Sequence, residues 1–259
     1  MSNDLHPLDA RFTALLRSGK RMHGIFNGLS CPAIVEMCAY AGFDFIVIDN
    51  EHGSSSLETT EHMLRAARAS GLPCAIRCLP QDISRTLDIG AGALQIPMVD
   101  SAEQARELVA QIKYPMPGGL GGKRGSAFST RAAGYGVFGD PGHTLRSNET
   151  IGLVAMVETP EGVKNAADIA AVDGVDAVFI GPNDLAHNMG YENRWDEAPV
   201  QAAIEQTIKA VAAAGKCPGI MALTPADEEK YAVWGARYFG TVTTAVITKA
   251  LMEAAGYKA

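Results

Sequence analysis

The sequence predicts a (β/α)8 TIM barrel, in which eight parallel strands alternate with helices. Short runs of β-branched and apolar residues alternate with longer amphipathic runs, and the 259 residues hold eight such pairs. This alternation is typical of βα units around a parallel sheet, and a barrel needs about 250 residues. A doubly wound open sheet is the main alternative, but no GxGxxG dinucleotide fingerprint follows the first predicted strand. We therefore expect one barrel domain over residues 1–259.

The predicted strands are short apolar runs, rich in β-branched residues. In chain order they are His23–Asn27, Phe45–Asp49, Cys74–Arg77, Ala93–Pro97, Gly152–Glu158, Ala177–Ile180, Pro218–Ala222 and Tyr238–Thr241. The predicted helices between them are Pro32–Ala41, Leu57–Ser70, Asp82–Gly90, Ala102–Ile112, Pro160–Ala171, Ala198–Ala214, Ala226–Trp234 and Thr244–Ala255. Several of these helices run into a glycine, such as Gly42 or Gly235, which is the expected stop signal.

One insertion interrupts the alternation, at about residues 113–150. It is rich in glycine and proline, and its core superficially resembles a phosphate-binding loop. The match fails because Pro117 stands where the first glycine is needed and Arg124 replaces the required Ser or Thr. Long loops of this kind are usually functional or disordered. We expect a lid or interface element in which Arg124 and Arg131 reach an anionic substrate; a solvated loop is the alternative.

Composition and charge exclude several classes of protein. The chain is 47% hydrophobic and carries a formal net charge of −7, without the basic stripe of a nucleic-acid binder. No apolar run approaches the roughly 20 residues that a membrane span needs, and no secretion signal is visible. The five cysteines form no CxxC pair. We therefore expect a cytoplasmic protein with reduced thiols that binds neither nucleic acid nor membrane.

Ionisable residues gather where the predicted strands end. Asp49 and His52 follow strand 2, Arg77 ends strand 3, Glu158 ends strand 5, and Asp184 follows strand 6. Catalytic residues of βα barrels lie at the carboxyl ends of the strands, on one rim. These five residues from four strands are therefore expected to converge on one site.

Glu158 and Asp184 form the candidate metal pair, because they follow adjacent strands. Neighbouring carboxylates repel unless a cation or a proton lies between them, and Mg²⁺ or Mn²⁺ is often held by one or two carboxylates. The alternative is that each residue only caps a helix. The stretch Gly181, Pro182, Asn183 and Asp184 opens a short helix whose free backbone N–H groups suit a substrate carboxylate, although it is also common turn chemistry.

Arg77 and His52 are the candidate groups for proton transfer and charge stabilisation. A guanidinium in an apolar strand needs an anion: either a substrate or enolate oxygen, or a barrel carboxylate in a structural ion pair. His52 is a candidate general base, and an ordinary loop histidine is the alternative. No lysine stands at the carboxyl end of a predicted strand, as a Schiff-base lyase would need. A metal mechanism is therefore favoured for any enolate chemistry.

The stretches FDFIVIDNEHG, LDIGAGALQIPMVDSAEQA, VAMVETPEGVKN and DGVDAVFIGPNDLA resemble the HpcH/HpaI aldolase family of metal-dependent class II pyruvate aldolases. The resemblance runs from about Gly24 to the C-terminus. It implies a barrel whose last helix is exchanged between subunits, in a homo-hexamer built from dimers. It also implies reversible cleavage of 4-hydroxy-2-oxo acids to pyruvate and an aldehyde through a metal-stabilised enolate, with Mg²⁺, Mn²⁺ or Co²⁺ as cofactor.

The resemblance also implies residue roles. Glu158 and Asp184 match the family's metal ligands, His52 its catalytic base and Arg77 its enolate-stabilising arginine. Asp88 matches an aspartate that raises the basicity of this histidine. Asn183 takes the place of a residue whose backbone amide contacts the substrate, and Asp49 stands at a further active-site position.

The chain departs from the family pattern at three places. Met156 replaces a glutamine that contacts substrate in some members, Asn50 stands where glycine is common, and the stretch 77–87 is a few residues short. Two other functions remain open. A carbon–carbon lyase acting on acyl-CoA uses the same barrel and carboxylate pair, but no basic cluster for coenzyme A is evident. A non-catalytic barrel that binds oxo acids is the second.

Overall fold

The computed structural model describes residues 6–256, and its strands form a closed parallel barrel. Each strand pairs with the next along the chain, and β8 pairs with β1 to close the ring. The strands are β1 Met22–Asn27, β2 Phe45–Asp49, β3 Cys74–Arg77, β4 Ala93–Ile96, β5 Gly152–Val157, β6 Ala177–Ile180, β7 Cys217–Met221 and β8 Tyr238–Val242. Every strand end lies within one residue of its prediction. The predicted TIM barrel is confirmed.

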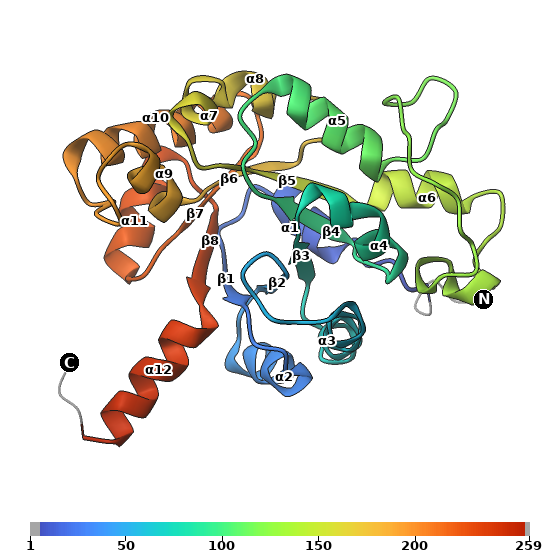
Figure 1. Ribbon diagram of the computed structural model, residues 1–259, viewed down its shortest axis with the longest axis horizontal. Helices are drawn as coiled ribbons and strands as arrows, with labels where there is room; N and C mark the ends of the chain where they lie inside the picture. Colours follow the sequence, from blue (N-terminus) through green and yellow to red (C-terminus); the bar gives the residue numbers. More distant parts are fainter. Residues whose placement is uncertain (1–5, 257–259) are drawn as a thin grey trace.

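Helices surround the barrel (Figure 1). They are α1 Arg11–Arg17, α2 Pro32–Ala41, α3 Leu57–Ala69, α4 Ile83–Asp88, α5 Ala102–Ile112, α6 His143–Thr150, α7 Pro160–Lys164, α8 Ala166–Ala170, α9 Pro182–Asn188, α10 Ala198–Ala213, α11 Pro225–Trp234 and α12 Thr243–Ala254, with short 3₁₀ turns η2 Pro80–Asp82 and η3 Arg131–Gly136. The helix predicted over Pro160–Ala171 is divided at Asn165 into α7 and α8. Helices α1 and α6 were not predicted.

Inward-pointing side chains fill the barrel, and large residues face small ones. A Cβ on Gly24 would lie 2.3 Å from the ring of Phe45, and one on Gly240 would lie 2.6 Å from the ring of Phe26. These glycines therefore leave room for aromatic rings contributed by neighbouring strands. Small–large alternation of this kind is how the interior of a narrow barrel is packed. The barrel interior is therefore packed rather than open.

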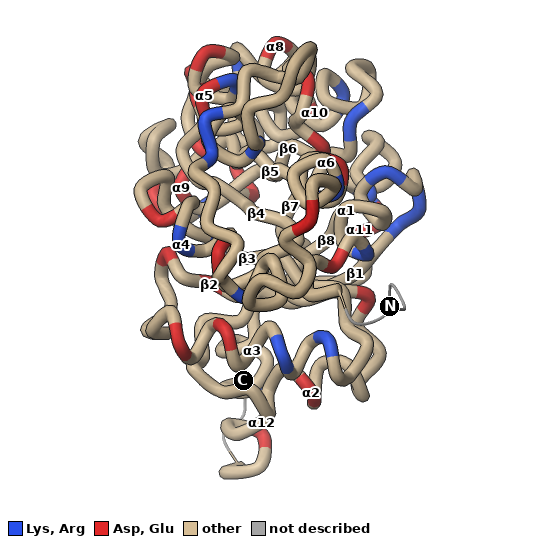
Figure 2. Tube along the Cα trace, turned by 90° about the vertical axis from the view of Figure 1, so that its right-hand side faces the viewer, with Lys and Arg blue, Asp and Glu red and all other residues tan. Residues whose placement is uncertain are grey.

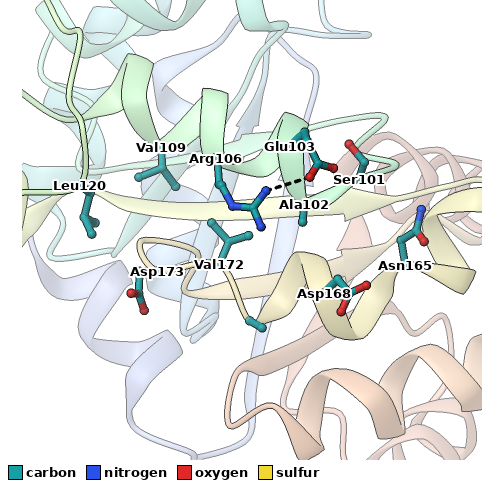
Figure 3. A pocket seen from close by; sticks show the side chains of 11 residues that line it. Ser101, Ala102, Glu103, Arg106, Val109, Leu120, Asn165, Asp168, Val172 and Asp173 are labelled. Atoms are coloured by element: carbon teal, nitrogen blue, oxygen red, sulfur yellow. Dashed lines mark hydrogen bonds and ion pairs between the residues drawn. The ribbon is translucent and has the colours of Figure 1, made fainter.

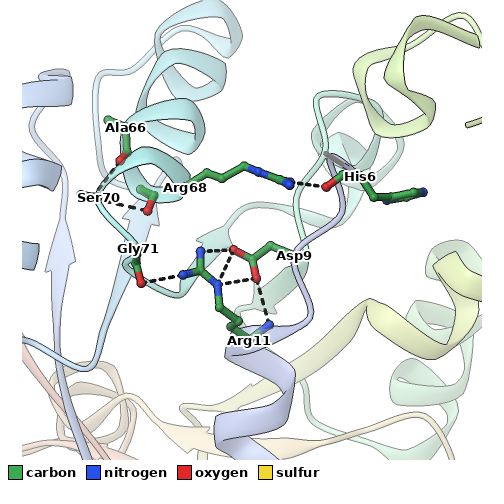
Figure 4. Close-up of polar contacts among 8 residues, drawn as sticks. His6, Asp9, Arg11, Ala66, Arg68, Ser70 and Gly71 are labelled. Carbon is green, nitrogen blue, oxygen red and sulfur yellow. Dashed lines mark hydrogen bonds and ion pairs between the residues drawn. The ribbon is translucent and has the colours of Figure 1, made fainter. Parts of the chain in front are cut away.

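The amino end of the barrel is sealed by α1. Phe12 of α1 packs edge-on against Phe45 and Tyr238, with ring centroids 5.4 and 5.8 Å away. The segment before α1 is tied down by polar contacts (Figure 4): Arg11 bonds to Asp9, and its Nη1 donates to the Gly71 carbonyl at 2.6 Å. These packed side chains cover this end of the barrel.

The insertion between α5 and β5 begins and ends at the amino end of the barrel, because a connection from a helix to the next strand returns to that end. Arg131 donates from Nη1 to the Ile89 carbonyl, in the turn before β4, at 2.7 Å. Arg124 is buried, with its guanidinium 4.5 Å from the centre of the Tyr114 ring. The expectation that these arginines reach a substrate in their own barrel is therefore wrong, and the buried Arg124 also contradicts a simply solvated loop.

Helix α12 projects away from the barrel (Figure 1). Its side chains Val246, Leu251 and Met252 are exposed, and Thr243 is its only buried residue. None of the helices described over residues 6–256 is both long and apolar enough to cross a bilayer. In the view of Figure 2, Lys and Arg are interspersed with Asp and Glu over the outer elements.

Candidate active site

A pocket of about 500 Å³ lies at the carboxyl ends of the strands. Its floor is a layer of inward-pointing residues from the odd-numbered strands: Phe26, Arg77, Met156 and Met221. Above this floor stand the other predicted site residues that line the pocket, namely Asp49, His52, Glu158, Gly181, Pro182, Asn183 and Asp184. The structure thus brings together every predicted site residue except Asp88.

Arg77 and Asp49 form a two-pronged ion pair. Nε of Arg77 donates to Oδ1 of Asp49 at 2.9 Å, and Nη2 donates to Oδ2 at 2.7 Å. The two residues are register partners on β3 and β2, so both side chains point into the barrel side by side. Burial opposes ionisation of Asp49, but the hydrogen bonds from Arg77 outweigh it and lower the pKa of Asp49. Of the two interpretations of Arg77, the ion pair with a barrel carboxylate is therefore present.

Glu51 was missed by the sequence reasoning, although it stands in the same DNEHG stretch. Its Oε2 lies 3.3 Å from Nη1 of Arg77 and 3.8 Å from Nε2 of His52. This oxygen is buried and has no hydrogen-bond partner among residues 6–256. Burial raises the pKa of Glu51, and the charges of Arg77 and His52 oppose that rise. Within the described chain, the carboxylate in contact with His52 is thus that of Glu51, and not that of the predicted Asp88.

His52 lies at the mouth of the pocket, with its side chain 66% exposed. The loop that carries it is fixed by Asp49, whose Oδ1 accepts the backbone N–H groups of Glu51 at 3.1 Å and His52 at 3.3 Å. Asp49 therefore has two functions here, because it anchors Arg77 and also shapes the loop after β2. The imidazole remains accessible to a substrate.

Glu158 is buried at the end of β5 and held from two sides. Its Oε2 accepts the backbone N–H of Met98 at 2.9 Å, and a Cβ on Gly181 would lie 2.3 Å from its Oε1. Burial raises the pKa of Glu158 to about 7; the Met98 hydrogen bond opposes this, and the charges of Asp184 and Glu51 add to it. Met98 has φ of 57°, an uncommon value outside glycine. The sequence did not reveal that Met98 adopts this uncommon conformation and donates its backbone N–H to Glu158.

Asp184 belongs to the first turn of α9, whose N-cap is Gly181 and whose first residue is Pro182. No side chain caps this helix. Asn183 and Asp184 are both exposed to the pocket opening. The expected short helix after β6 is confirmed, and its free amino end faces the pocket.

Asp88 lies outside the pocket, so the structure of one chain does not bring it to His52. It ends α4, close to the turn that begins β4, and therefore lies toward the amino end of the barrel. Its Oδ1 is 3.7 Å from Nη2 of the buried Arg124. Burial raises the pKa of Asp88, and Arg124 opposes that rise. A helix that descends along the barrel carries its last residue away from the carboxyl end, which explains the separation.

The donor set fits a hard divalent cation that keeps several water or substrate ligands. Glu158 and Asp184 offer two carboxylates, and no cluster of three or more His, Cys, Asp or Glu residues suited to a metal occurs within residues 6–256. Burial raises the pKa of Glu158, and the charges of Asp184 and Glu51 add to the rise, so a cation beside this carboxylate would favour its ionised form. Mg²⁺ and Mn²⁺ are typically bound by one or two carboxylates with the remaining positions open.

A larger hollow of about 600 Å³ lies elsewhere, on the outside of the barrel beside α5 and α8 (Figure 3). Its charged residues include Glu103 and Arg106, which pair with each other at 3.0 Å, and Asp168. It lies away from the strand ends and none of the residues predicted to be functional lines it. The smaller pocket is therefore the candidate active site.

Gly181→Ala should disrupt the candidate metal site. The added methyl group would overlap the Glu158 carboxylate, which would have to move from its present position. We expect the affinity for Mn²⁺, measured by calorimetric titration, to fall by about 10- to 100-fold, as a misplaced ligand does. Gly125→Ala is the matched control, since nothing lies within 4 Å of a Cβ there and its φ lies outside the left-handed region. Unchanged affinity in Gly181→Ala would contradict the assigned orientation of Glu158.

Comparison with known proteins gives a consistent result. The family model HpcH/HpaI aldolase/citrate lyase matches residues 22–246. A hydroxypyruvate/pyruvate aldolase of Delftia acidovorans is 39% identical over 88% of this chain and 84% of that protein. A 2-keto-3-deoxy-L-rhamnonate aldolase of Klebsiella pneumoniae is 37% identical over 92% of this chain and 88% of that protein.

Solved structures agree with the sequence comparisons. The crystal structure of an HpcH/HpaI aldolase/citrate lyase family protein from Burkholderia cenocepacia superposes with a TM-score of 0.90 and 28% identity. The match covers 96% of this chain and 98% of that one. A shared barrel and a family model over most of the length lead to one conclusion: this chain belongs to the HpcH/HpaI aldolase/citrate lyase family.

Proposed function

We propose that this protein reversibly cleaves 4-hydroxy-2-oxo acids to pyruvate and an aldehyde. One observation carries the proposal: an accessible imidazole and an anchored guanidinium share a pocket with two carboxylates from adjacent strands. Relatives named as aldolases at 36–39% identity make the chain a carbon–carbon lyase of the pyruvate aldolase type. The reaction needs a base, an oxyanion stabiliser and an electrophile, and each has a candidate here.

Glu158 and Asp184 would hold the divalent metal, whether Mg²⁺, Mn²⁺ or Co²⁺. A bound metal supplies Lewis-acid polarisation of the 2-oxo group. The amino end of α9, with Asn183 in its first turn, would take the substrate carboxylate through free backbone N–H groups. Met98 and Gly181 keep Glu158 in place for this task.

His52 would accept the proton of the 4-hydroxyl group as the C3–C4 bond breaks. The electron pair of that bond passes into the pyruvate enolate, and Arg77 would donate hydrogen bonds to the enolate oxygen. Arg77 commits one N–H each from Nε and Nη2 to Asp49, which leaves other N–H groups for substrate. Its rigid anchoring means that little reorganisation is needed during the reaction.

A homo-oligomer is part of the proposal. The projecting α12 exposes Val246, Leu251 and Met252, a surface that a second copy would cover if the last helix were exchanged between subunits. Asp88 cannot support His52 within one chain, so that role would require the aspartate of a neighbouring copy in the expected hexamer. Analytical ultracentrifugation tests this: a monomer at micromolar concentration would contradict it. The free cysteines, including the accessible Cys31, support a reducing, cytoplasmic location.

The decisive experiment measures pyruvate release from a 4-hydroxy-2-oxo acid with and without EDTA. We expect pyruvate only when a divalent metal is present. Oxaloacetate provides a second substrate, since its decarboxylation passes through the same enolate. Saturable binding of coenzyme A without aldol turnover would instead favour the acyl-CoA lyase, and binding of an oxo acid without any turnover would favour a non-catalytic barrel.

A further inference from the structure

We propose that the insertion between α5 and β5 serves the active site of a neighbouring copy of the chain, and that it does so through Arg124. Arg124 holds Asp88, and Asp88 in turn supports His52 of the neighbouring copy. The inference rests on the aldolase function given above and deepens it, because it assigns Arg124 as a positioning residue for the base. The insertion thereby becomes part of the catalytic assembly.

The insertion is anchored where it begins and where it ends. Nζ of Lys113 donates to the Asn148 and Ile151 carbonyls, both at 2.6 Å. The Asn148 side chain accepts the Tyr114 N–H at 2.8 Å and donates to the Tyr114 carbonyl at 3.0 Å. The backbone N–H of Arg124 donates to the Lys113 carbonyl at 3.0 Å. These bonds join the two ends of the insertion and fix the backbone from which the Arg124 side chain extends.

The Arg124 side chain is a buried cation with one carboxylate beside it. It is 1% exposed, and its guanidinium lies over the Tyr114 ring. None of its three guanidinium nitrogens has a hydrogen-bond partner within residues 6–256. The other titratable groups close to it are Tyr114, Lys113 and His143, and none of them is an anion near neutral pH. Because a guanidinium stays charged when buried, the carboxylate of Asp88, 3.7 Å away, compensates its charge.

Asp88 is held from the inside of the protein and open to the outside. Its side chain is 32% exposed, and within residues 6–256 Arg124 is its one side-chain partner. Burial raises the pKa of Asp88 and Arg124 opposes that rise, so Arg124 favours the ionised carboxylate. An ionised carboxylate fixed on one side is suited to orient an imidazole on its open side and to stabilise the imidazolium that forms there.

Asp88 and His52 can meet only between two copies. Asp88 lies toward the amino end of its barrel, whereas His52 is exposed at the carboxyl end. The insertion exposes the large apolar side chains Phe128, Tyr135 and Val137, and its 3₁₀ turn η3 packs against α4, the helix that Asp88 ends. An apolar surface next to α4 is one that a second copy would cover. Contact between this surface and the mouth of a neighbouring barrel would bring Asp88 to the His52 of that barrel.

The first test follows the pH dependence of turnover. Arg124→Met should lower kcat/KM for pyruvate release from a 4-hydroxy-2-oxo acid by about 10- to 100-fold, the usual effect of losing a group that orients an active-site side chain. Asp88 is then no longer held as an anion beside the base, so the acidic limb of the pH profile of kcat/KM should move to lower pH. Asp88→Asn should reproduce both changes. Arg124→Lys keeps the cation and should restore the position of the limb.

Lys123→Met is the matched control, because its exposed ammonium group pairs with Glu107 at the surface. It should change neither kcat/KM nor the limb. Analytical ultracentrifugation ensures that all variants are compared in the same oligomeric state. A pH profile of Arg124→Met with its limb in the wild-type position would overturn the inference, because loss of a residue that only stabilises the fold lowers activity without moving the limb.

The second test establishes whether Arg124 acts on another copy. His52→Ala and Arg124→Met chains that carry different affinity tags are expressed together, and mixed oligomers are isolated through both tags. With random assortment, about a quarter of the sites combine an intact His52 of one chain with the intact Arg124 and Asp88 of the other. We expect pyruvate release to recover to at least about that fraction of the wild-type rate, above either parent.

The outcomes separate the inference from the proposed function. Mixed oligomers that are no more active than Arg124→Met alone would overturn the inference, since Arg124 would then act only within its own chain. A wild-type protein that releases no pyruvate would overturn the aldolase function, and the inference with it.

Discussion

Metal-free Glu158→Gln should unfold at a higher temperature than the metal-free wild type at pH 8. Burial raises the pKa of Glu158 from its ordinary value of 4.5, which holds in the unfolded chain, to about 7 in the folded protein. Below pH 4.5 both states are protonated and the buried carboxyl costs nothing. Between pH 4.5 and about 7 the unfolded chain ionises while the folded state still holds the proton, so stability falls, and above pH 7 the full loss remains. A shift of this size corresponds to about 3 kcal/mol.

The glutamine removes that charge while its side-chain oxygen still accepts the Met98 N–H. For a chain of this size, about 3 kcal/mol corresponds to roughly 5–10 °C in the unfolding midpoint. Differential scanning calorimetry in EDTA measures the unfolding midpoints of the variant and the wild type at pH 8 and at pH 5. The difference between the two midpoints should be smaller at pH 5. Glu161→Gln, at an exposed position in the next helix, is the control and should change nothing.

Divalent metal should reverse the order of stability. The wild type should gain stability from Mn²⁺, because the cation would supply the counter-charge, whereas the variant would lack one of the two proposed ligands and should gain little. The wild type should also bind Mn²⁺ more weakly below pH 7, where a proton competes for Glu158. Equal Mn²⁺ affinity in wild type and variant would show that Glu158 is not a ligand.

The barrel itself was predictable, since each strand is an apolar β-branched run with a polar or glycine-rich boundary. Buried parallel strands have this local pattern irrespective of their partners. Helix α1 was missed because its apolar residues Phe12 and Leu16 pack under the barrel, a contact with no local signal. The division of the helix at Asn165 was also missed because it involves a contact between residues far apart in the sequence. The Asn165 side chain donates a hydrogen bond to the Asp100 carbonyl.

The site was predictable to the extent that topology fixes it. Residues at strand ends must meet on one rim, so Arg77, Glu158 and Asp184 were placed correctly. Glu51 was overlooked because a residue after a strand can point either way, and only coordinates show its approach to Arg77. The expectation that Arg124 and Arg131 of the insertion reach the site of their own barrel failed for a topological reason that the sequence did contain, whereas an interface element stays a prediction. A helix-to-strand connection lies at the amino end, opposite to the chemistry.

Arg77→Met should cost both stability and turnover, for separable reasons. The substitution leaves the carboxylates of Asp49 and Glu51 buried without their cation, since side-chain exposure is 9% and 13%. Breaking a buried ion pair in this way destabilises by about 3–5 kcal/mol. Loss of a hydrogen-bond donor to the enolate should lower kcat for pyruvate release by about 100- to 1,000-fold.

A second substitution separates the two effects. Asp49→Asn in the Arg77→Met background removes one stranded charge, while its side-chain oxygen still accepts the N–H groups of Glu51 and His52. Urea unfolding should therefore show stability largely restored, whereas kcat should stay low. Arg85→Met, at an exposed position of α4, controls for the loss of an arginine. If kcat recovered together with stability, Arg77 would serve only to hold the fold. Removing the charge of Asp49 can restore stability, but it cannot restore a hydrogen bond from Arg77 to the enolate.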